Sequence, residues 1–209
     1  MQPSYKGTFE AHITVKAVNA ELKRKFCLLC QKLAVKCVFI ELPQGVTRSQ
    51  MMTASYHHGA FKDVLQKINQ IAEKIVNADF EVTRIKIEAM VSNQDIPIFD
   101  IEAQKLPKSN YFEFHVEAIL SASENLEVLK KYCLQHNAHL SKNAFKKLID
   151  GKHERFITMR IYGLGYKSAQ TRFDNLILYL KSKGFKLSQQ QREYTVYDTN
   201  LNLDNGWIN

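Results

Sequence analysis

The chain carries one succession of hydrophobic patterns twice, and this repetition limits the possible folds more than any other feature of the sequence. Alternation of apolar and polar residues is typical of a strand with one buried face, and apolar residues at helical spacing are typical of a helix packed on one side. The first half reads as strand, helix, strand, strand, helix and strand over residues 9–15, 20–35, 36–42, 51–57, 59–76 and 81–90. The second half repeats this order over residues 111–119, 124–136, 139–145, 155–162, 166–183 and 191–198.

A stretch without periodicity separates the two patterned halves. Between Val91 and Asn110 the helical and strand patterns disappear, and Pro97 and Pro107 interrupt the chain, which is typical of a linker. The predicted division is a first repeat, a linker, and a second repeat with a C-terminal tail, at residues 1–92, 93–110 and 111–209. In the tail, Trp207 is predicted to dock on the body of the protein, because a freely exposed indole there would be unfavourable.

The order of the elements predicts an α+β fold. Strand, helix, strand, strand, helix, strand is the ferredoxin-like, or split βαβ, unit, in which a four-stranded antiparallel sheet carries both helices on one face. The chain is therefore predicted to be a tandem duplication of βαββαβ units related by a pseudo-twofold axis. Because helices cover only one face, the other face of each sheet is left for solvent, for the sister repeat or for a site.

Composition limits the environment and the partners of the protein. No stretch approaches the roughly 18–20 consecutive apolar residues of a membrane span, and the N-terminus lacks the apolar core of a secretory signal. We therefore expect a soluble, cytoplasmic protein with no membrane partner. The net charge of +8 and the pI near 9.2 favour anionic partners, such as nucleotides, RNA ends or other phosphate esters.

The four cysteines are expected to be reduced and structural. Three of them crowd one helix and the following strand, while Cys133 is distant in sequence, which fits a reducing compartment. Cys27 and Cys30 have CxxC spacing, but Cys30 falls on the apolar stripe of its helix. Neither a second CxxC nor a nearby histidine completes a zinc site. We therefore predict core packing rather than metal or redox chemistry, and no cofactor.

Strand alternation points two sets of polar side chains away from the helices. The first strands present Glu10, His12 and Thr14 in one half, and Glu113, His115 and Glu117 in the other. The third strands are predicted to add Thr53, Ser55 and His57 in one half, and Thr158, Arg160 and Tyr162 in the other. If the repeats pack about a pseudo-twofold axis, the two histidines face each other across a polar cleft that also holds Lys86.

Two histidines that face one cleft suit the hydrolysis of a phosphodiester. One imidazole can take a proton from water or a hydroxyl and the other can protonate the leaving oxygen, because the pKa of histidine is near neutrality. Hydroxyl groups and a guanidinium can bind the phosphate and stabilise its added charge. This chemistry requires no metal.

The sequence His-Ile-Thr-Val at residues 12–15 resembles one of the two His-x-Thr/Ser motifs of the two-histidine phosphoesterases. This bilobal superfamily includes RNA 2′,3′-cyclic phosphodiesterases. In the second half, His115 is followed by Glu117 where the family has a hydroxyl, and a carboxylate repels phosphate. The resemblance implies His12 and His115 as the catalytic pair and Thr14 as a phosphate ligand. It also implies a nucleotide or RNA-end phosphodiester, including a cyclic one, as the substrate.

The substrate-binding candidates share a predicted position on the free sheet faces. They are Thr14, Thr53, His57, Lys86, Glu117, Thr158, Arg160 and Tyr162. The same residues also fit roles without catalysis. Equivalent positions of a duplicated gene could retain a half-buried histidine that only bonds to a neighbouring strand. The protein could also be a non-catalytic module that holds RNA or a nucleotide, or an interaction protein whose free sheet faces pack together.

Overall fold

The computed structural model describes residues 3–16, 19–121, 125–143 and 152–208, and its elements follow the predicted order. The helices are α1 (Ala20–Lys32), α2 (Phe61–Val76), α3 (Asp100–Ala103), α4 (Leu126–Leu134), α5 (Tyr166–Ser182) and the 3-10 helix η1 (Leu201–Asp204). The strands are β1 (Lys6–Val15), β2 (Lys36–Glu41), β3 (Ser49–Ala60), β4 (Val82–Met90), β5 (Tyr111–Leu120), β6 (Ala138–Asn143), β7 (His153–Tyr162) and β8 (Lys186–Asp198). The α+β class is confirmed, and the predicted strand beyond Asn143 lies outside the described residues.

Local sequence explains where the helices begin. The Asn19 side chain accepts a hydrogen bond from the Leu22 N–H at 2.9 Å, and Asn125 accepts one from the Glu127 N–H at 2.9 Å. Asparagine caps a helix well because its side-chain oxygen satisfies an amide that has no partner within the first turn. None of the described helices has the length and the apolar character that a membrane crossing requires.

All the named strands join in one closed barrel with the order β1-β3-β2-β6-β7-β5-β8-β4, and neighbouring strands are antiparallel. The sequence predicted a sheet for each half, whereas the structure joins both halves at two seams. The seam between β4 and β8 has five paired positions, and the seam between β2 and β6 has two. Closure removes the edge strands that separate sheets would expose, because their backbone N–H and C=O groups find partners in the other half.

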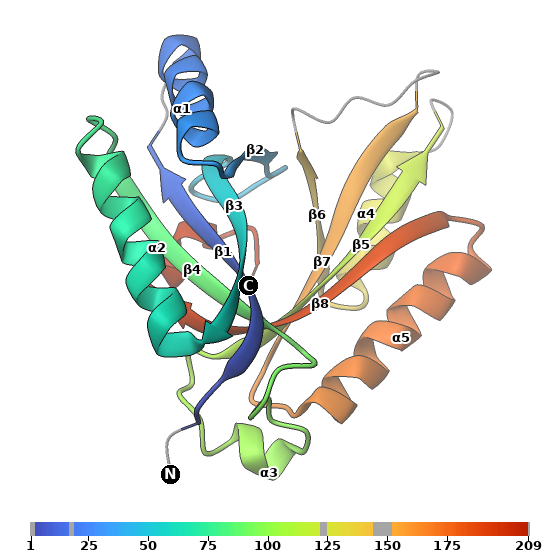
Figure 1. Cartoon of the computed structure of the whole chain (residues 1–209). Coiled ribbons are helices and arrows are strands. Elements are labelled where there is room, and N and C mark those ends of the chain that lie inside the picture. Colours follow the sequence, from blue (N-terminus) through green and yellow to red (C-terminus); the bar gives the residue numbers. More distant parts are fainter. Residues whose placement is uncertain (1–2, 17–18, 122–124, 144–151, 209) are drawn as a thin grey trace.

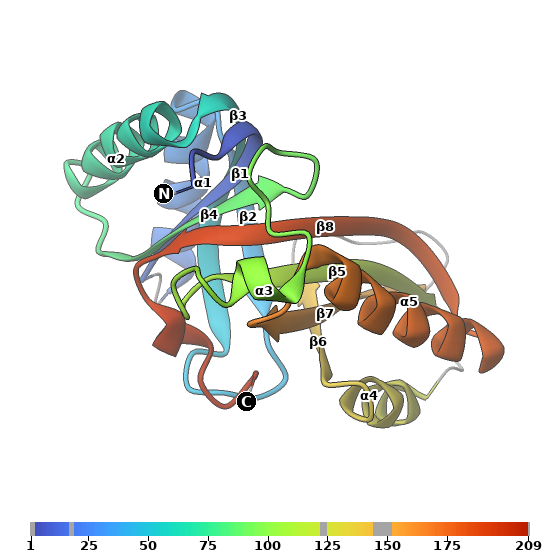
Figure 2. The ribbon, with the colours of Figure 1, turned by 90° about the horizontal axis from the view of Figure 1, so that it is seen from below.

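The helices cover the outside of the barrel. In Figure 1, α1 and α2 lie along the strands of the first half, and α4 and α5 lie along those of the second half. Figure 2 shows β8 crossing from one half to the other between these two groups of helices. The core lies between the helices and the strands, and its fully buried members include Phe9, Phe26, Ile68, Phe112, Phe114 and Phe173. The apolar faces of the strands are therefore used by the helices, which leaves the polar faces for the barrel interior.

The segment predicted as a linker is packed against the barrel and contains α3. Asn93 accepts a hydrogen bond from the Thr8 N–H at 2.9 Å and donates one to the Thr8 carbonyl at 2.7 Å. Gly7 has φ +143°, and a Cβ there would lie 2.3 Å from the Asn93 side chain, so glycine is required for this approach. The Tyr166 N–H also donates to the Pro97 carbonyl at 2.8 Å, which attaches the start of α5 to the same segment.

Replacing Phe114 by alanine tests the core of the second half. Phe114 is fully buried, and its ring centroid lies 5.3 Å from that of Phe173 and 5.6 Å from that of Phe112. We expect Phe114→Ala to lower the free energy of unfolding by about 3–5 kcal/mol, measured by urea denaturation. Leu178→Ala, on the exposed face of α5, should change it by less than about 0.5 kcal/mol. Equal losses in the two variants would contradict this assignment of the core.

Candidate functional site

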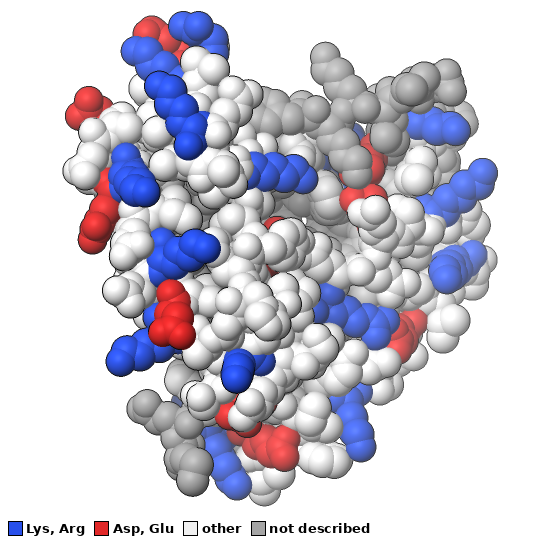
Figure 3. Space-filling model, in the orientation of Figure 1, with Lys and Arg blue, Asp and Glu red and all other residues white. Residues whose placement is uncertain are grey.

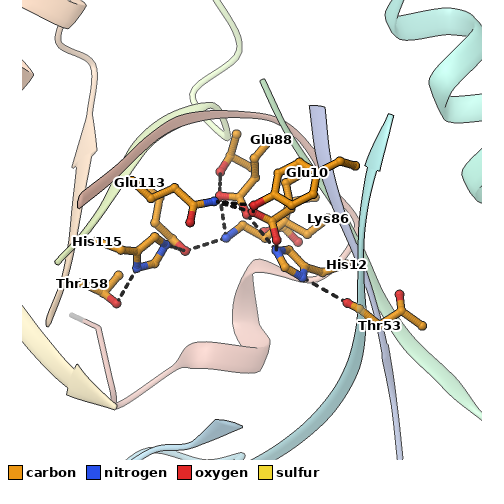
Figure 4. A network of polar contacts seen from close by, with 12 residues as sticks. Glu10, His12, Thr53, Lys86, Glu88, Glu113, His115 and Thr158 are labelled. Atoms are coloured by element: carbon orange, nitrogen blue, oxygen red, sulfur yellow. Dashed lines mark hydrogen bonds and ion pairs between the residues drawn. The ribbon is translucent and has the colours of Figure 1, made fainter. Parts of the chain in front are cut away.

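The barrel contains a cavity of about 490 Å³ that is open to solvent on one part of its surface and lined by residues from both halves. The side chains that β1 and β5 turn away from the helices all line it, namely Glu10, His12, Thr14, Glu113, His115 and Glu117. Alternation along these two strands is therefore as predicted. Figure 4 shows His12 and His115 directed into the same polar network.

Backbone and carboxylate contacts orient the imidazole of His12. Its Nδ1 lies 3.1 Å from the Thr53 carbonyl, and because a carbonyl only accepts, this contact places a proton on Nδ1. Its Nε2 lies 3.5 Å from Oε2 of Glu88 and 3.8 Å from Oε1 of Glu10. The free nitrogen of His12 is thus directed into the cavity, where it faces two carboxyl groups.

His115 has a matching environment in the second half. Its Nδ1 lies 2.9 Å from the hydroxyl of Thr158 on β7, and its Nε2 lies 3.3 Å from Oε1 of Glu113. In each half, therefore, the third strand holds Nδ1 and a carboxyl group faces Nε2. The hydroxyl of Thr158 can donate or accept, so His115 can carry its Nδ1 proton or release it without losing this bond.

Buried acidic and basic side chains alternate across the barrel in a connected series, which we name the charge chain. In order, it consists of Asp198, Arg84, Asp204, Arg160, Glu113, Lys86 and Glu88. Arg84 lies 2.5 Å from Asp198 and 2.8 Å from Asp204, and Asp204 also lies 2.6 Å from Arg160. None of these side chains is more than 6% exposed.

The other end of the charge chain reaches the histidines. Arg160 donates to Glu113 through Nε, and Lys86 lies 2.6 Å from Glu113 and 2.8 Å from Glu88. Because Glu113 faces His115 and Glu88 faces His12, a continuous line of polar contacts joins the two imidazoles (Figure 4).

Paired charges decide the ionisation of the buried acids in the charge chain. Burial alone would raise the pKa of Glu113, but Arg160 and Lys86 hold it well below its usual range. Burial likewise opposes ionisation of Asp204, and Arg160 and Arg84 lower its pKa. Both acids are therefore carboxylates. Each cation of the charge chain contacts two acidic side chains of that charge chain.

Glu10 and Glu193 form a carboxyl pair beside the charge chain. Burial raises the pKa of Glu10, but His12 and the hydrogen bond from Tyr56 bring it below its usual range. Burial, followed by the carboxylates of Glu88 and Glu10, raises the pKa of Glu193 well above its usual range. Glu193 is therefore the protonated member of the pair and donates to Glu10.

The opposite side of the cavity is largely apolar. Its lining includes Val38, Ile40, Leu42, Met52, Ala54, Phe156 and Trp207. Trp207 is 6% exposed and its indole N–H donates to the Leu140 carbonyl at 2.9 Å, so the predicted docking of this residue is confirmed. The cavity thus combines an acidic side with a hydrophobic one.

Three residues predicted for the cleft, Thr53, Ser55 and His57, lie on the other face of β3. This strand presents Met52, Ala54 and Tyr56 to the cavity. Thr53 and His57 face the helices, as does Met51, which belongs to the core. The prediction of their orientation was wrong because helices cover one face of β3 and the cavity lies on the other. Both faces carry polar and apolar side chains, so the alternation of polar residues does not identify the face that lines the cavity. Thr53 still takes part through its backbone carbonyl.

The remaining candidates are placed as follows. Thr158 and Arg160 of β7 and Lys86 of β4 line the cavity. Tyr162 lies at the end of β7, outside the cavity lining, with 46% of its surface exposed and its ring 4.8 Å from that of Tyr111. Arg160 and Lys86 were expected to meet a phosphate directly, whereas both are held by carboxylates.

Sequence reasoning missed several residues of the site. On β4, Arg84 and Glu88 point into the barrel on either side of Lys86, which was predicted. On β8, Gln191, Glu193 and Thr195 point into the barrel at alternate positions. Charged residues at alternate positions between aliphatic ones were a usable signal for those on β4. Asp204 has no such signal, because it comes from a short helix after the last strand.

A metal ion has no prepared site in the part of the chain that the structure describes. There, no group of three or more His, Cys, Asp or Glu side chains has a suitable arrangement. Cys27 and Cys37 lie with their Sγ atoms 2.7 Å apart, and Cys30 is buried in the core as predicted. The cavity therefore offers acid–base and hydrogen-bonding groups.

Asp204→Asn tests the charge chain. Removing one partner of a buried ion pair costs about 3–5 kcal/mol, so the free energy of unfolding at pH 7 should fall by about this amount. The pKa of Asp204 is lower in the folded protein, so its contribution is complete above the unfolded pKa of about 4 and is lost as the pH falls through the folded pKa. The variant should therefore lose less stability than the wild type on acidification.

Urea denaturation at a series of pH values below 7 measures both effects. Glu21→Gln is the matched control, because Glu21 forms an exposed pair with Lys25 on α1. The control should follow the wild-type curve closely. Parallel curves for the wild type and Asp204→Asn would show that Asp204 does not have the assigned role.

Comparison with known proteins assigns no family to this site. The chain matches no protein-family model, and no curated protein has significant similarity to it. The residues of the cavity, with their distances and charges, are therefore the basis on which function is inferred.

Proposed function

We propose that the protein is a metal-independent phosphoesterase that hydrolyses a phosphodiester, such as a cyclic phosphate of a nucleotide or of an RNA end. The observation that supports this proposal most is that His12 and His115, from corresponding strands of the two halves, line one cavity. Both rings are held through Nδ1 and turn Nε2 inward. Two such imidazoles suit a reaction that needs one proton removed and another delivered.

The contacts suggest which histidine is the base. The Thr53 carbonyl keeps the proton of His12 on Nδ1, so the neutral ring carries its lone pair on Nε2 and can take a proton from water. Carboxylates face Nε2 of both rings, but the contact of Glu113 with His115, at 3.3 Å, is shorter than that of Glu88 with His12, at 3.5 Å. The proton on Nε2 is therefore favoured more strongly on His115, and we assign His115 as the acid. Water then adds to phosphorus, His12 takes its proton, and the leaving oxygen receives the proton of His115 as the ester bond breaks.

The phosphate is held in this proposal by groups outside the charge chain. Arg160 and Lys86 are each held by two carboxylates, and displacing these would leave buried acids without partners. Thr14 lines the cavity with a hydroxyl, and Lys36 of β2 lines it with an exposed side chain. These two residues are the proposed phosphate ligands. Glu117, on the same strand as His115, is not one of them, because its carboxylate would repel the phosphate.

A duplication would explain the corresponding histidines. Exchanging β1, β2, β3 and β4 for β5, β6, β7 and β8 leaves the neighbours of every strand in the barrel unchanged. We therefore propose that the halves are ferredoxin-like repeats related by a pseudo-twofold axis that passes through the cavity. The motifs Glu10-x-His12 and Glu113-x-His115 then occupy equivalent positions.

A non-catalytic module that binds a nucleotide or RNA is the second candidate. The observation that favours it is that the cations of the charge chain are already held by carboxylates, which limits the stabilisation of a reacting phosphate. Basic residues on the outside could still attract an anionic partner. In Figure 3 they are scattered over the visible face rather than gathered in one patch, so a long RNA has no single track on that face.

Hydrolysis of 2′,3′-cyclic nucleotides and dinucleotide diesters, followed by phosphorus NMR, tests the enzyme. His12→Ala and His115→Ala should each lower kcat by about 10²–10⁴, because each removes one proton-transfer group. His58→Ala is the matched control, since His58 is an exposed β3 residue that contacts Thr8 at 3.2 Å. Turnover that survives in the two histidine variants would exclude the mechanism. Equilibrium binding of the same nucleotides without turnover would instead support the second candidate.

A further inference from the structure

One corner of the cavity gathers carboxyl groups from neighbouring strands. Glu10 of β1 is the register partner of Glu88 of β4, and Glu193 of β8 is the register partner of Glu113 of β5. Glu10, Glu88 and Glu193 make up what we name the acidic corner, and all three line the cavity. Lys86 is the cation of the charge chain that contacts this corner, and it also contacts Glu113. His12, with its Nε2 3.5 Å from Glu88 and 3.8 Å from Glu10, is the other basic group in contact with the corner, so three carboxyl groups face two basic side chains, one of which is shared with Glu113.

Glu193 leaves a polar atom without a partner in this corner. The residue is 1% exposed, and its Oε1 has no hydrogen-bond partner among the described residues. A buried polar atom in this state is unfavourable by about 1–3 kcal/mol, so it is expected to meet a partner in the functional state. Because Glu193 lines the cavity, that partner would be a ligand.

We propose that the acidic corner binds the ammonium or guanidinium head group of an organic cation whose apolar body lies along the hydrophobic side of the cavity. A cation supplies both the donor that Oε1 of Glu193 lacks and the positive charge that the carboxyl groups lack. On binding, Glu193 gives up its proton and becomes the carboxylate that pairs with the head group.

Fixed contacts prepare the corner for this role. Tyr56 donates its hydroxyl to Glu10 at 2.9 Å, and Gln191 donates its side-chain amide to the same oxygen. Thr195 donates to Oε1 of Glu88 at 3.1 Å. These donors hold two carboxylates in place without neutralising them, so the negative charge is preorganised for a cation.

The surroundings favour an organic cation over a metal ion. Within the described residues, no group of His, Cys, Asp or Glu side chains is arranged to hold a metal. The cavity of about 490 Å³ has room for a small molecule, and aliphatic residues with Phe156 and Trp207 line its other side. A head group at the acidic corner and an apolar body along this lining would use both parts of the cavity.

Trp207 provides a direct measurement of binding, because it is the only tryptophan of the chain and lines the cavity. The probes are hexylammonium, hexanol and hexanoate, which share one alkyl chain and differ in the head group. The expected result is that hexylammonium changes the tryptophan fluorescence with a Kd about tenfold or more below that of hexanol, and that hexanoate binds most weakly. Equal affinities for the amine and the alcohol, or tighter binding of hexanoate, would overturn the proposal.

Glu193→Gln separates the charge from the shape of the corner. The amide keeps the size of the side chain but cannot ionise, so the Kd for hexylammonium should rise about tenfold or more while that for hexanol stays constant. Glu73→Gln, on the exposed surface of α2, is the control for net charge and should leave both Kd values unchanged. A Glu193→Gln protein that binds the amine as the wild type does would contradict the proposal. The comparison of probes on the wild type decides the question even if the variant does not fold.

Calorimetry in buffers of different ionisation enthalpy tests the proton release. The charged groups facing Glu193 are Glu10 on β1, Glu88 and Lys86 on β4, and Glu113 on β5. At pH 7 about one proton should be released for each hexylammonium bound by the wild type and close to none by Glu193→Gln. Release of equal amounts by both proteins would assign the proton to another group and contradict the role of Glu193. This binding does not depend on hydrolysis, so a negative turnover screen and a negative amine titration are separate results.

Discussion

The charge chain is the interaction on which the rest of the structure depends. An ion removed from water into a protein interior loses several kcal/mol of hydration, and only close partners of opposite charge compensate for this loss. Arg84, Lys86 and Arg160 each have two such partners. The partners come from β4, β5, β8 and η1, so the ion pairs connect elements that are distant in sequence. The same contacts keep the interior of the barrel polar instead of filled with hydrophobic side chains.

The charge chain also orients the side chains of the candidate site. The carboxylates that neutralise the cations also face the two imidazoles, so the orientation of His12 and His115 depends on the charge chain. The acidic corner adds Glu10, whose nearest basic group is His12 at 3.8 Å, and Glu193, whose pKa is raised by burial and by its carboxylate neighbours. The proposed proton transfer at the histidines and the proposed recognition of a positive head group at the corner therefore use different atoms of one cavity. A molecule that carries both a phosphodiester and an amine could occupy both places.

Short-range patterns predicted most of the fold and part of the site. The order of the elements and the inward direction of His12 and His115 followed from alternation, because one face of β1 and β5 is strongly apolar. Alternation failed at β3, where Thr53 packs beneath the helices although it is polar. Closure of the barrel and the position of Asp204 depend on contacts between distant segments, which no local period encodes. The site was therefore predictable in its histidines and not in the ion pairs around them.

The distribution of these partners between the halves determines how the protein folds. Both carboxylates that contact Arg84 belong to the second half, as does one of the two that contact Lys86. A first half that folded alone would hold two cations in its interior with most of their counter-ions missing, and such a state is strongly disfavoured. Each half thus supplies counter-ions to the other, and we expect the whole barrel to unfold cooperatively. If the two halves arose by duplication, as we propose, the repeated pattern marks where one ancestral copy ends and the next begins. It does not divide the protein into two units that are stable by themselves.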